Sequence, residues 1–184
     1  LMRRLICASV KQLDRLSFPC GDAVHMSGWD GVVSSPEPID MVPEGISLWE
    51  CGVNKDIQTK ANDDIIKRAA NPLGHIKSDS AFVFVTPREW PGANVWTTAN
   101  QSGWKKLVVY TAVELEVWIE KCPAVGVWLA EKLNVLNAGG YQLPYVFWTQ
   151  WASGDRYTLP YQIVTAGRNQ VMDKVLKACL GPTI

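Results

Sequence analysis

Two uninterrupted apolar runs constrain what this chain can fold into more than any other feature of its sequence. The first begins the segment 81–87 (AFVFVTP), which ends at a proline, and the second lies inside the segment 105–112 (KKLVVYTA). Short apolar runs of this kind are typical of central strands that are buried on both faces, as in parallel sheets covered by helices. Because helical patterns precede and follow these runs, the sequence predicts an α/β domain.

The remaining patterns predict the order α, β-β-β, α, β, α, β, α. Apolar spacing and turn residues give the individual elements. The expected elements are a helix at residues 1–10, two strands joined by a turn within 16–33, a strand at 46–52, a helix at 54–71, the two apolar strands with a loop and a short helix between them, one or two helices within 113–133, and a helix at 169–180. Asn54 is the expected cap of the helix at 54–71, and Pro123 is expected to start a helix.

Composition limits the classes of function. The chain has 184 residues, with 18 Lys plus Arg and 18 Asp plus Glu, so its formal net charge is zero. No global field attracts nucleic acid, and any DNA contact must use a local basic patch. No apolar run is long enough to cross a bilayer, which predicts no membrane partner. The five cysteines are scattered without metal-binding spacing, which favours reduced thiols in the cytoplasm.

The chain divides near residue 136. Residues 1–136 carry the α/β pattern and are expected to form one domain. Residues 137–184 are rich in aromatic residues, glycine and proline before the final helical pattern, which we interpret as a linker and the start of a following, absent region. Because the sequence begins inside a helical pattern without an initiator methionine, we expect it to be a fragment of a larger protein.

The candidate chemistry lies on two carboxylates and one amine. Asp30 directly precedes the predicted strand at 31–34, and Glu50 lies near the end of the strand at 46–52. Two carboxylates that converge at the ends of neighbouring strands are suitable ligands for Mg²⁺ (or Mn²⁺), which can support phosphodiester hydrolysis. Lys60, one turn into the next helix, is the candidate that orients the attacking water. The alternative is that Asp30 is only a turn residue and Glu50 only a strand end.

Basic side chains near these carboxylates are candidate phosphate contacts. A mixed-sign helical face is, however, usually solvated surface. The tryptophans after the first apolar run can equally be base-stacking or core residues. The candidate nucleic-acid-binding residues are Lys67, Arg68, Arg88 and Lys105, and the tryptophans are Trp90, Trp96 and Trp104.

Several other chemistries lack their motifs. The sequence contains no GxSxG nucleophile elbow, no phosphate-binding P-loop and no dinucleotide-binding GxGxxG. His25 and His75 are not beside residues with zinc-ligand spacing, which argues against a structural zinc site. Hydrolysis assisted by a hard divalent cation is the chemistry that the remaining residues favour.

The succession of an Asp at one strand and a Glu at the next, before a helix, resembles the PD-(D/E)xK nuclease superfamily. The segments GWDGVV, VPEGISLWECG, KDIQTKANDDIIKR and FVFVTPREWPGANVW are similar to an N-terminal domain of large bacterial STAND-type ATPases linked to anti-phage defence. This resemblance implies a restriction-endonuclease-like mixed sheet flanked by helices, Mg²⁺-dependent cleavage of DNA, and a homo-oligomer formed through the parent protein.

The sequence departs from that superfamily at one position. The superfamily has lysine two residues after the glutamate, and this chain has Gly52 there. Similarity to members that carry this cation on the adjacent helix implies Lys60 or Lys55 as the replacement. The departure also suggests a second hypothesis, a catalytically degenerate fold kept as a recognition or assembly module. A third is a generic α/β interaction domain that uses the aromatic residues of 141–161.

The nuclease hypothesis makes a geometric demand. Asp30 and Glu50 must meet beside a positive amine, and neither may be lost to a local salt bridge.

Overall fold

The computed structural model describes residues 1–10, 12–19, 28–101, 103–135, 148–149, 152, 160, 163 and 166–180. The chain forms two compact units, Leu1–Leu129 and Ala130–Ile184. The helices are α1 (Met2–Ser9), α2 (Ile57–Ala70), α3 (Ala93–Asn100), α4 (Ala112–Lys121), α5 (Pro123–Lys132) and α8 (Asn169–Leu180), with a short 3₁₀ helix at Lys77–Asp79. The strands are β1 (Arg15–Ser17), β2 (Gly31–Ser35), β3 (Gly45–Cys51), β4 (Ser80–Val85) and β5 (Lys106–Tyr110).

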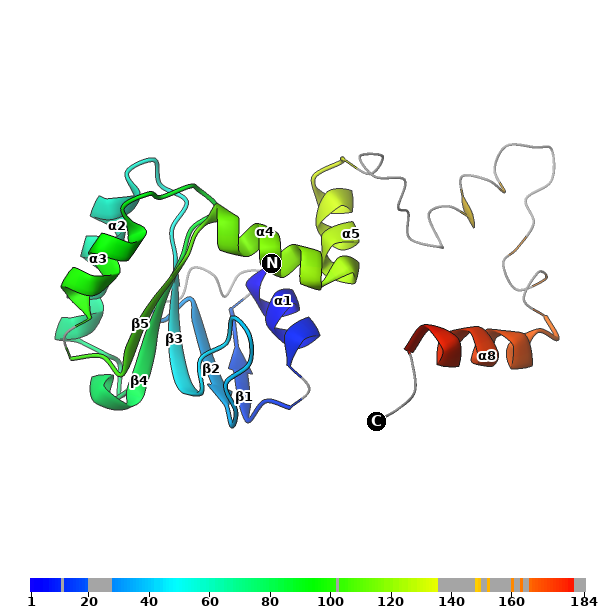
Figure 1. The fold of residues 1–184 in the computed structure, drawn as a ribbon, viewed down its shortest axis with the longest axis horizontal. Coiled ribbons are helices and arrows are strands. Elements are labelled where there is room, and N and C mark those ends of the chain that lie inside the picture. The colour runs from blue at the N-terminus through cyan, green and yellow to red at the C-terminus, as the bar shows by residue number, and fades with distance from the viewer. Residues whose placement is uncertain are drawn as a thin grey trace. The chain divides into compact units, whose positions relative to one another are not determined.

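The five strands form one mixed sheet in the order β1-β2-β3-β4-β5 (Figure 1). β1 and β2 pair antiparallel, as do β2 and β3, whereas β3, β4 and β5 run parallel. The predicted α/β class is confirmed, and the mixed sheet flanked by helices is compatible with a restriction-endonuclease-like fold. The predicted element order and both apolar strands are likewise confirmed.

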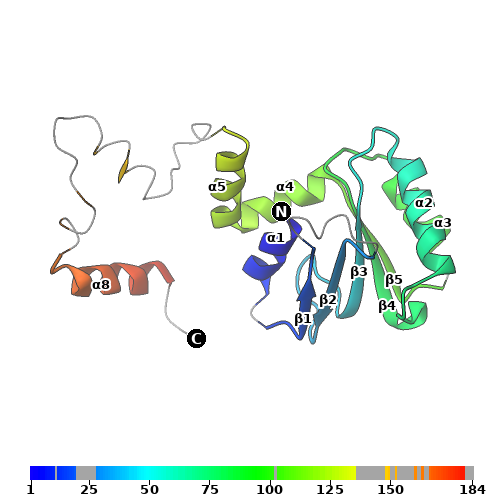
Figure 2. The ribbon, with the colours of Figure 1, turned by 180° about the vertical axis from the view of Figure 1, so that it is seen from behind.

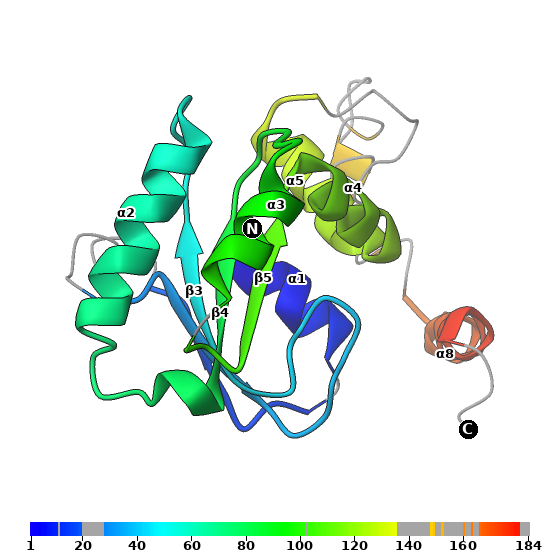
Figure 3. The ribbon, with the colours of Figure 1, turned by 60° about the vertical axis from the view of Figure 1, so that its left-hand side comes forward.

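Helices cover both faces of the sheet. α2 and α3 lie on one face, and α1 and α4 lie on the other, as opposite views show (Figures 1 and 2) and a turned view confirms (Figure 3). Every residue of β4 is therefore buried, which explains why its sequence is continuously apolar rather than alternating. Side chains of Leu48, Phe82 and Leu107 stand in one row beneath α2 and α3, because these residues are register partners.

Aromatic side chains fill both halves of the core. On the face covered by α1 and α4, Trp49 and Trp118 are fully buried and pack against Tyr110. The ring centroids of each pair among these three residues are about 6 Å apart. On the face covered by α2 and α3, Trp96 and Trp104 are 5% and 6% exposed. The core interpretation is therefore confirmed for these two residues, and base stacking on them is not available.

Helix boundaries follow local capping chemistry. Asp56 caps α2, because its Oδ1 accepts the N–H of Thr59 at 3.0 Å, so the prediction that Asn54 is the cap was wrong. α4 begins with a capping box between Thr111 and Glu114. Pro123 starts α5, as predicted.

The predicted helix at 169–180 is present as α8. Most of the aromatic stretch at 141–161 lies outside the described residues, as does His25, so the interaction-domain hypothesis is not addressed there. Among the helices that the structure describes, none combines the length and apolar character that a membrane span requires.

Candidate functional site

Antiparallel pairing of β2 and β3 brings Asp30 beside Glu50. Gly31 is the register partner of Trp49, so Asp30 lies at the carboxyl end of β3. Its Oδ2 accepts the backbone N–H of Cys51 at 2.7 Å. One carboxylate is thus fixed next to the residue that follows Glu50, and the two predicted metal ligands share one edge of the sheet.

Glu50 is a buried carboxylate. Side chains of a strand alternate between the two faces of the sheet, so Glu50 faces α2 as Leu48 does. Glu50 is 4% exposed. Its Oε1 accepts a hydrogen bond from Nε of Arg68 in an ion pair. Burial is the main cause that raises the pKa of Glu50 to about 7, and Asp30 and Asp64 add to this effect, whereas Arg68 opposes it.

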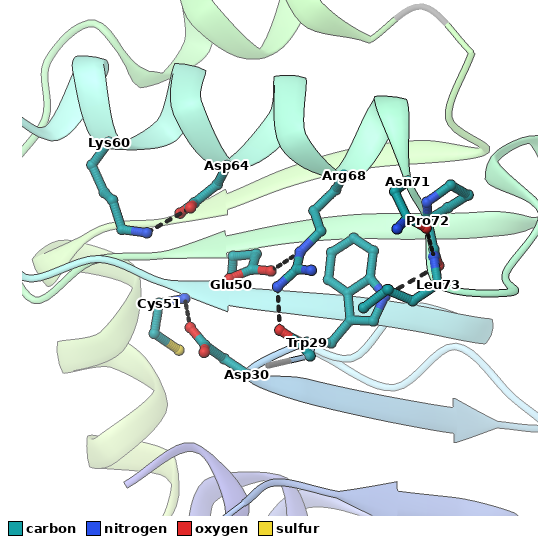
Figure 4. A network of polar contacts seen from close by, with 11 residues as sticks. Trp29, Asp30, Glu50, Cys51, Lys60, Asp64, Arg68, Asn71, Pro72 and Leu73 are labelled. Carbon is teal, nitrogen blue, oxygen red and sulfur yellow. Dashed lines mark hydrogen bonds and ion pairs between the residues drawn. The ribbon is translucent and has the colours of Figure 1, made fainter. Parts of the chain in front are cut away.

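Arg68 is a core residue and not a surface cation. Its side chain is 5% exposed, and besides Glu50 it donates to the backbone carbonyl of Gly28. Its guanidinium carbon lies 4.7 Å from the centre of the Trp29 ring, and Trp29 in turn donates to the carbonyl of Pro72 at 3.3 Å (Figure 4). The prediction that Arg68 contacts phosphates was therefore wrong, because its guanidinium is buried against protein acceptors.

Lys60 and Asp64 form the second ion pair beneath α2. Lys60 Nζ lies 2.5 Å from Asp64 Oδ1, and Figure 4 shows the pair beside Glu50 and Arg68. Asp64 is 6% exposed, and its Oδ2 is buried without a hydrogen-bond partner in the described part of the chain. Asp64 was not among the predicted site residues, although its position in the helix sequence could have identified it. Positions 60, 64 and 68 form a stripe next to the apolar stripe of Ala61 and Ile65, at the border of the buried face.

Gly52 has no room for a side chain. A Cβ at this position would lie 2.8 Å from Phe84 Cζ and 3.0 Å from Lys60 Cγ. The aliphatic stem of Lys60 therefore covers the space above the residue where the superfamily carries its lysine. Lys55, the second candidate for that amine, is exposed in the segment between β3 and α2.

We expect Gly52→Ala to lower the free energy of unfolding by about 1–3 kcal/mol, because the new methyl group overlaps a fully buried ring and displaces the Lys60 stem. Urea denaturation measures this change. Gly28→Ala is the matched control, because no atom of the described residues, apart from Gly28 and its chain neighbours, lies within 4 Å of the position that its new Cβ would take. Equal stability of the two variants would show that the space above Gly52 is not closed.

The other predicted phosphate contacts are dispersed. Lys67 is exposed on α2, and Arg88 is exposed beyond the end of β4, where its Nε donates to the carbonyl of Val53 at 3.0 Å. Lys105 directly precedes β5 at the opposite, amino-terminal edge of the parallel strands, and it lines a surface hollow of about 500 Å³. Arg88 therefore shares the edge of Asp30 and Glu50, and Lys105 does not.

The site holds more negative than positive charge. Three carboxylates (Asp30, Glu50 and Asp64) lie around two cations (Lys60 and Arg68). Within the described part of the chain, no three His, Cys, Asp or Glu residues are grouped so that they could hold a metal ion. A cation here would have Asp30 and Glu50 as protein ligands and would keep several waters, as Mg²⁺ commonly does.

Fold and site together define a mixed α/β protein with an acidic cluster at the carboxyl edge of its parallel strands. Comparisons of the chain with protein families, with curated proteins and with solved structures found no match.

Proposed function

We propose that this domain is a metal-dependent endonuclease that hydrolyses phosphodiester bonds of DNA. Asp30 and Glu50 hold Mg²⁺ or Mn²⁺, and Lys60 orients the attacking water. The observation that carries the proposal is the meeting of Asp30 and Glu50 at one sheet edge, where Asp30 accepts the N–H of Cys51. The stem of Lys60 over Gly52 supports its role as the displaced amine.

The residues fit a divalent cation on two grounds. Lys60 pairs with Oδ1 of Asp64, but among the described residues Oδ2 has no hydrogen-bond partner, and a buried acceptor without a partner costs free energy. Mutual repulsion among Asp30, Glu50 and Asp64 contributes to the raised pKa of Glu50. A bound cation would relieve both effects. Arg68 pairs with Oε1 of Glu50, so the condition that neither carboxylate is held in a salt bridge is not met for Glu50. A cation would have to share this carboxylate with Arg68, and this feature opposes the fit.

Each residue has a distinct task in this proposal. A bound Mg²⁺ would lower the pKa of water and neutralise the charge that develops on the scissile phosphate. Asp30 and Glu50 fix the position of that charge relative to the sheet. Lys60, whose side chain is 29% exposed, pairs its ammonium with Asp64 Oδ1, and the other donors of this ammonium can orient the attacking water. The exposed cations Lys67 and Arg88 attract the DNA backbone.

The test is cleavage of supercoiled plasmid by the purified chain with Mg²⁺ or Mn²⁺. We expect Asp30→Ala and Glu50→Gln to reduce cleavage about 100-fold or more, as expected for the loss of a group that stabilises transition-state charge. Asp63→Ala is the matched control, because Asp63 is a carboxylate next to Asp64 that is not buried in the site. Equal cleavage by the wild type and the Asp30 and Glu50 variants would refute the assignment.

The proposal includes a setting for the enzyme. We place the domain at the N-terminus of a cytoplasmic bacterial STAND-type ATPase involved in anti-phage defence. Association through the ATPase part brings two copies together for double-strand cleavage, because paired sites act at a high local concentration. A version of the protein that carries the ATPase region should therefore produce linear plasmid, whereas the chain alone should mainly produce nicked circles.

A second candidate function is favoured by the Arg68 ion pair. A catalytically degenerate fold that serves as a recognition or assembly module has no need of a metal, and a guanidinium can then neutralise Glu50 permanently. Calorimetric titration with Mn²⁺ separates the two candidates. Heat that disappears in Asp30→Ala supports the nuclease, and the absence of ion binding in the wild type supports the module.

A further inference from the structure

One buried side chain contacts both segments that supply the proposed metal ligands. From α2, Arg68 donates through Nε to the Glu50 carboxylate of β3 and through a terminal nitrogen to the carbonyl of Gly28. Its guanidinium also lies against the ring of Trp29. Because Gly28 and Trp29 directly precede Asp30, the same guanidinium connects the segment that carries Asp30 to Glu50.

These contacts require an arginine in particular. A guanidinium is planar and presents its donors in a fixed fork, so it can satisfy two acceptors on different segments and lie flat against an aromatic ring. A lysine ammonium carries the same charge but lacks the planar, fixed arrangement of donors that reaches two acceptors at once. With 5% of its side chain exposed and three contacts, Arg68 is held in place and cannot swing into solvent without breaking all of them.

We propose that Arg68 is a positioning residue, which holds the Asp30 segment and the Glu50 carboxylate in the relative geometry that a shared divalent cation needs. The inference rests on the proposed function and deepens it. Arg68 contacts neither the ion nor DNA, and it acts through Glu50 and through the backbone that leads to Asp30. It has the same relation to the carboxylates as the hydrogen-bonding partners that orient ligands in known metal sites.

The first test is Mn²⁺ binding to the intact 184-residue chain, measured by calorimetry. We expect Arg68→Lys to weaken Mn²⁺ binding about 10- to 100-fold, as the loss of a ligand's orienting partner does. Gln58→Ala is the matched control, because it truncates an exposed polar side chain of the same helix and should leave the affinity unchanged. Circular dichroism verifies that the variants compared are folded.

The second test needs no metal. The N–H of Cys51 is donated to the Asp30 side chain, so its hydrogen exchange reports how firmly the Asp30 segment is held against β3. We expect Arg68→Lys to accelerate this exchange about tenfold, which corresponds to the loss of a charge-assisted hydrogen bond. Gln58→Ala should leave the exchange unchanged. Arg68→Gln, a neutral replacement, provides a second variant with the same expected direction.

The outcomes separate this inference from the proposed function. Exchange of the Cys51 amide at the wild-type rate in both Arg68 variants would overturn the positioning role, whether or not the chain binds a metal. Tighter Mn²⁺ binding by Arg68→Lys would also overturn it, because Arg68 would then compete with the ion for Glu50. If the wild type binds no Mn²⁺ while exchange accelerates in the variants, the proposed function fails and the link from Arg68 to the Asp30 segment stands.

Discussion

Arg68→Ala should lower the free energy of unfolding by about 3–5 kcal/mol at pH 8, the largest stability change we expect from one substitution near the site. Removing one partner of a buried ion pair leaves the other charge uncompensated in a poorly solvated environment. Glu50 is 4% exposed, so water cannot replace the guanidinium. The hydrogen bond to Gly28 and the contact with Trp29 are lost as well.

This destabilisation should depend on pH in a defined direction. Arg68 lowers the pKa of Glu50, so without Arg68 the carboxyl group takes up a proton more readily and escapes part of the penalty at acidic pH. Urea denaturation at pH 8 and at pH 5 measures both values, with Lys67→Ala as a control that should change stability by less than about 0.5 kcal/mol. A loss below about 1 kcal/mol at pH 8 would contradict a buried, functional ion pair.

Replacing both partners tests whether the pair is kept for stability. Buried ion pairs are often no more stabilising than apolar residues of similar size. We therefore expect the double variant Glu50→Met and Arg68→Met to recover most of the stability that Arg68→Ala loses. If it does, the chain retains the pair for a reason other than stability, which agrees with a functional role for Glu50.

The stability of Glu50→Gln relative to the wild type should increase as pH rises through about 7, although the substitution removes a proposed metal ligand and the charged partner of Arg68. The pKa of Glu50 is raised from 4.5 to about 7 in the folded state, mainly by burial, so the folded protein binds this proton more tightly than the unfolded chain does. The stability from this group is fully present below pH 4.5 and is lost as pH rises through about 7. That difference corresponds to about 3 kcal/mol at pH 8.

The measurement is the unfolding free energy of the wild type and Glu50→Gln from pH 4 to pH 8. We expect the contribution of Glu50 to fall across this range in the wild type and to be missing in the variant. Glu44→Gln, at an exposed carboxylate, is the control that should leave the pH dependence unchanged. A difference in stability between Glu50→Gln and the wild type that stays constant from pH 4 to pH 8 would contradict the raised pKa of Glu50.

The strands and helices could be predicted because each has a local cause. Continuous burial of β4 requires the apolar run of residues 81–85, and the proline that starts α5 is visible in the sequence. The prediction that Asn54 caps α2 failed because Asp56, two positions later, is also a typical capping residue. Only the contact of its side chain with Thr59 shows which of the two is the cap.

The site could be predicted only in part. Asp30 and Glu50 could be paired because neighbouring strand ends lie close together, whereas the partners of Arg68 could not. Whether a helical arginine faces solvent or a buried carboxylate depends on the rotation of α2 about its axis, which the mixed sequence of its polar face does not define. For the same reason the sequence did not identify Asp64, which is buried because of the rotation of α2 about its axis.

The absence of a side chain at Gly52 has a mechanical consequence. An amine on β3 would move with the carboxylates, but the amine of Lys60 belongs to a helix that is joined to the sheet only by packing, by its side-chain contacts and by its connecting segments. The same helix carries Arg68, whose contacts with Glu50 and Gly28 oppose any sliding of α2 along the sheet. The distance from the Lys60 ammonium to the Asp30 and Glu50 carboxylates is therefore set by how one helix packs on the sheet, and not by the pairing of the strands.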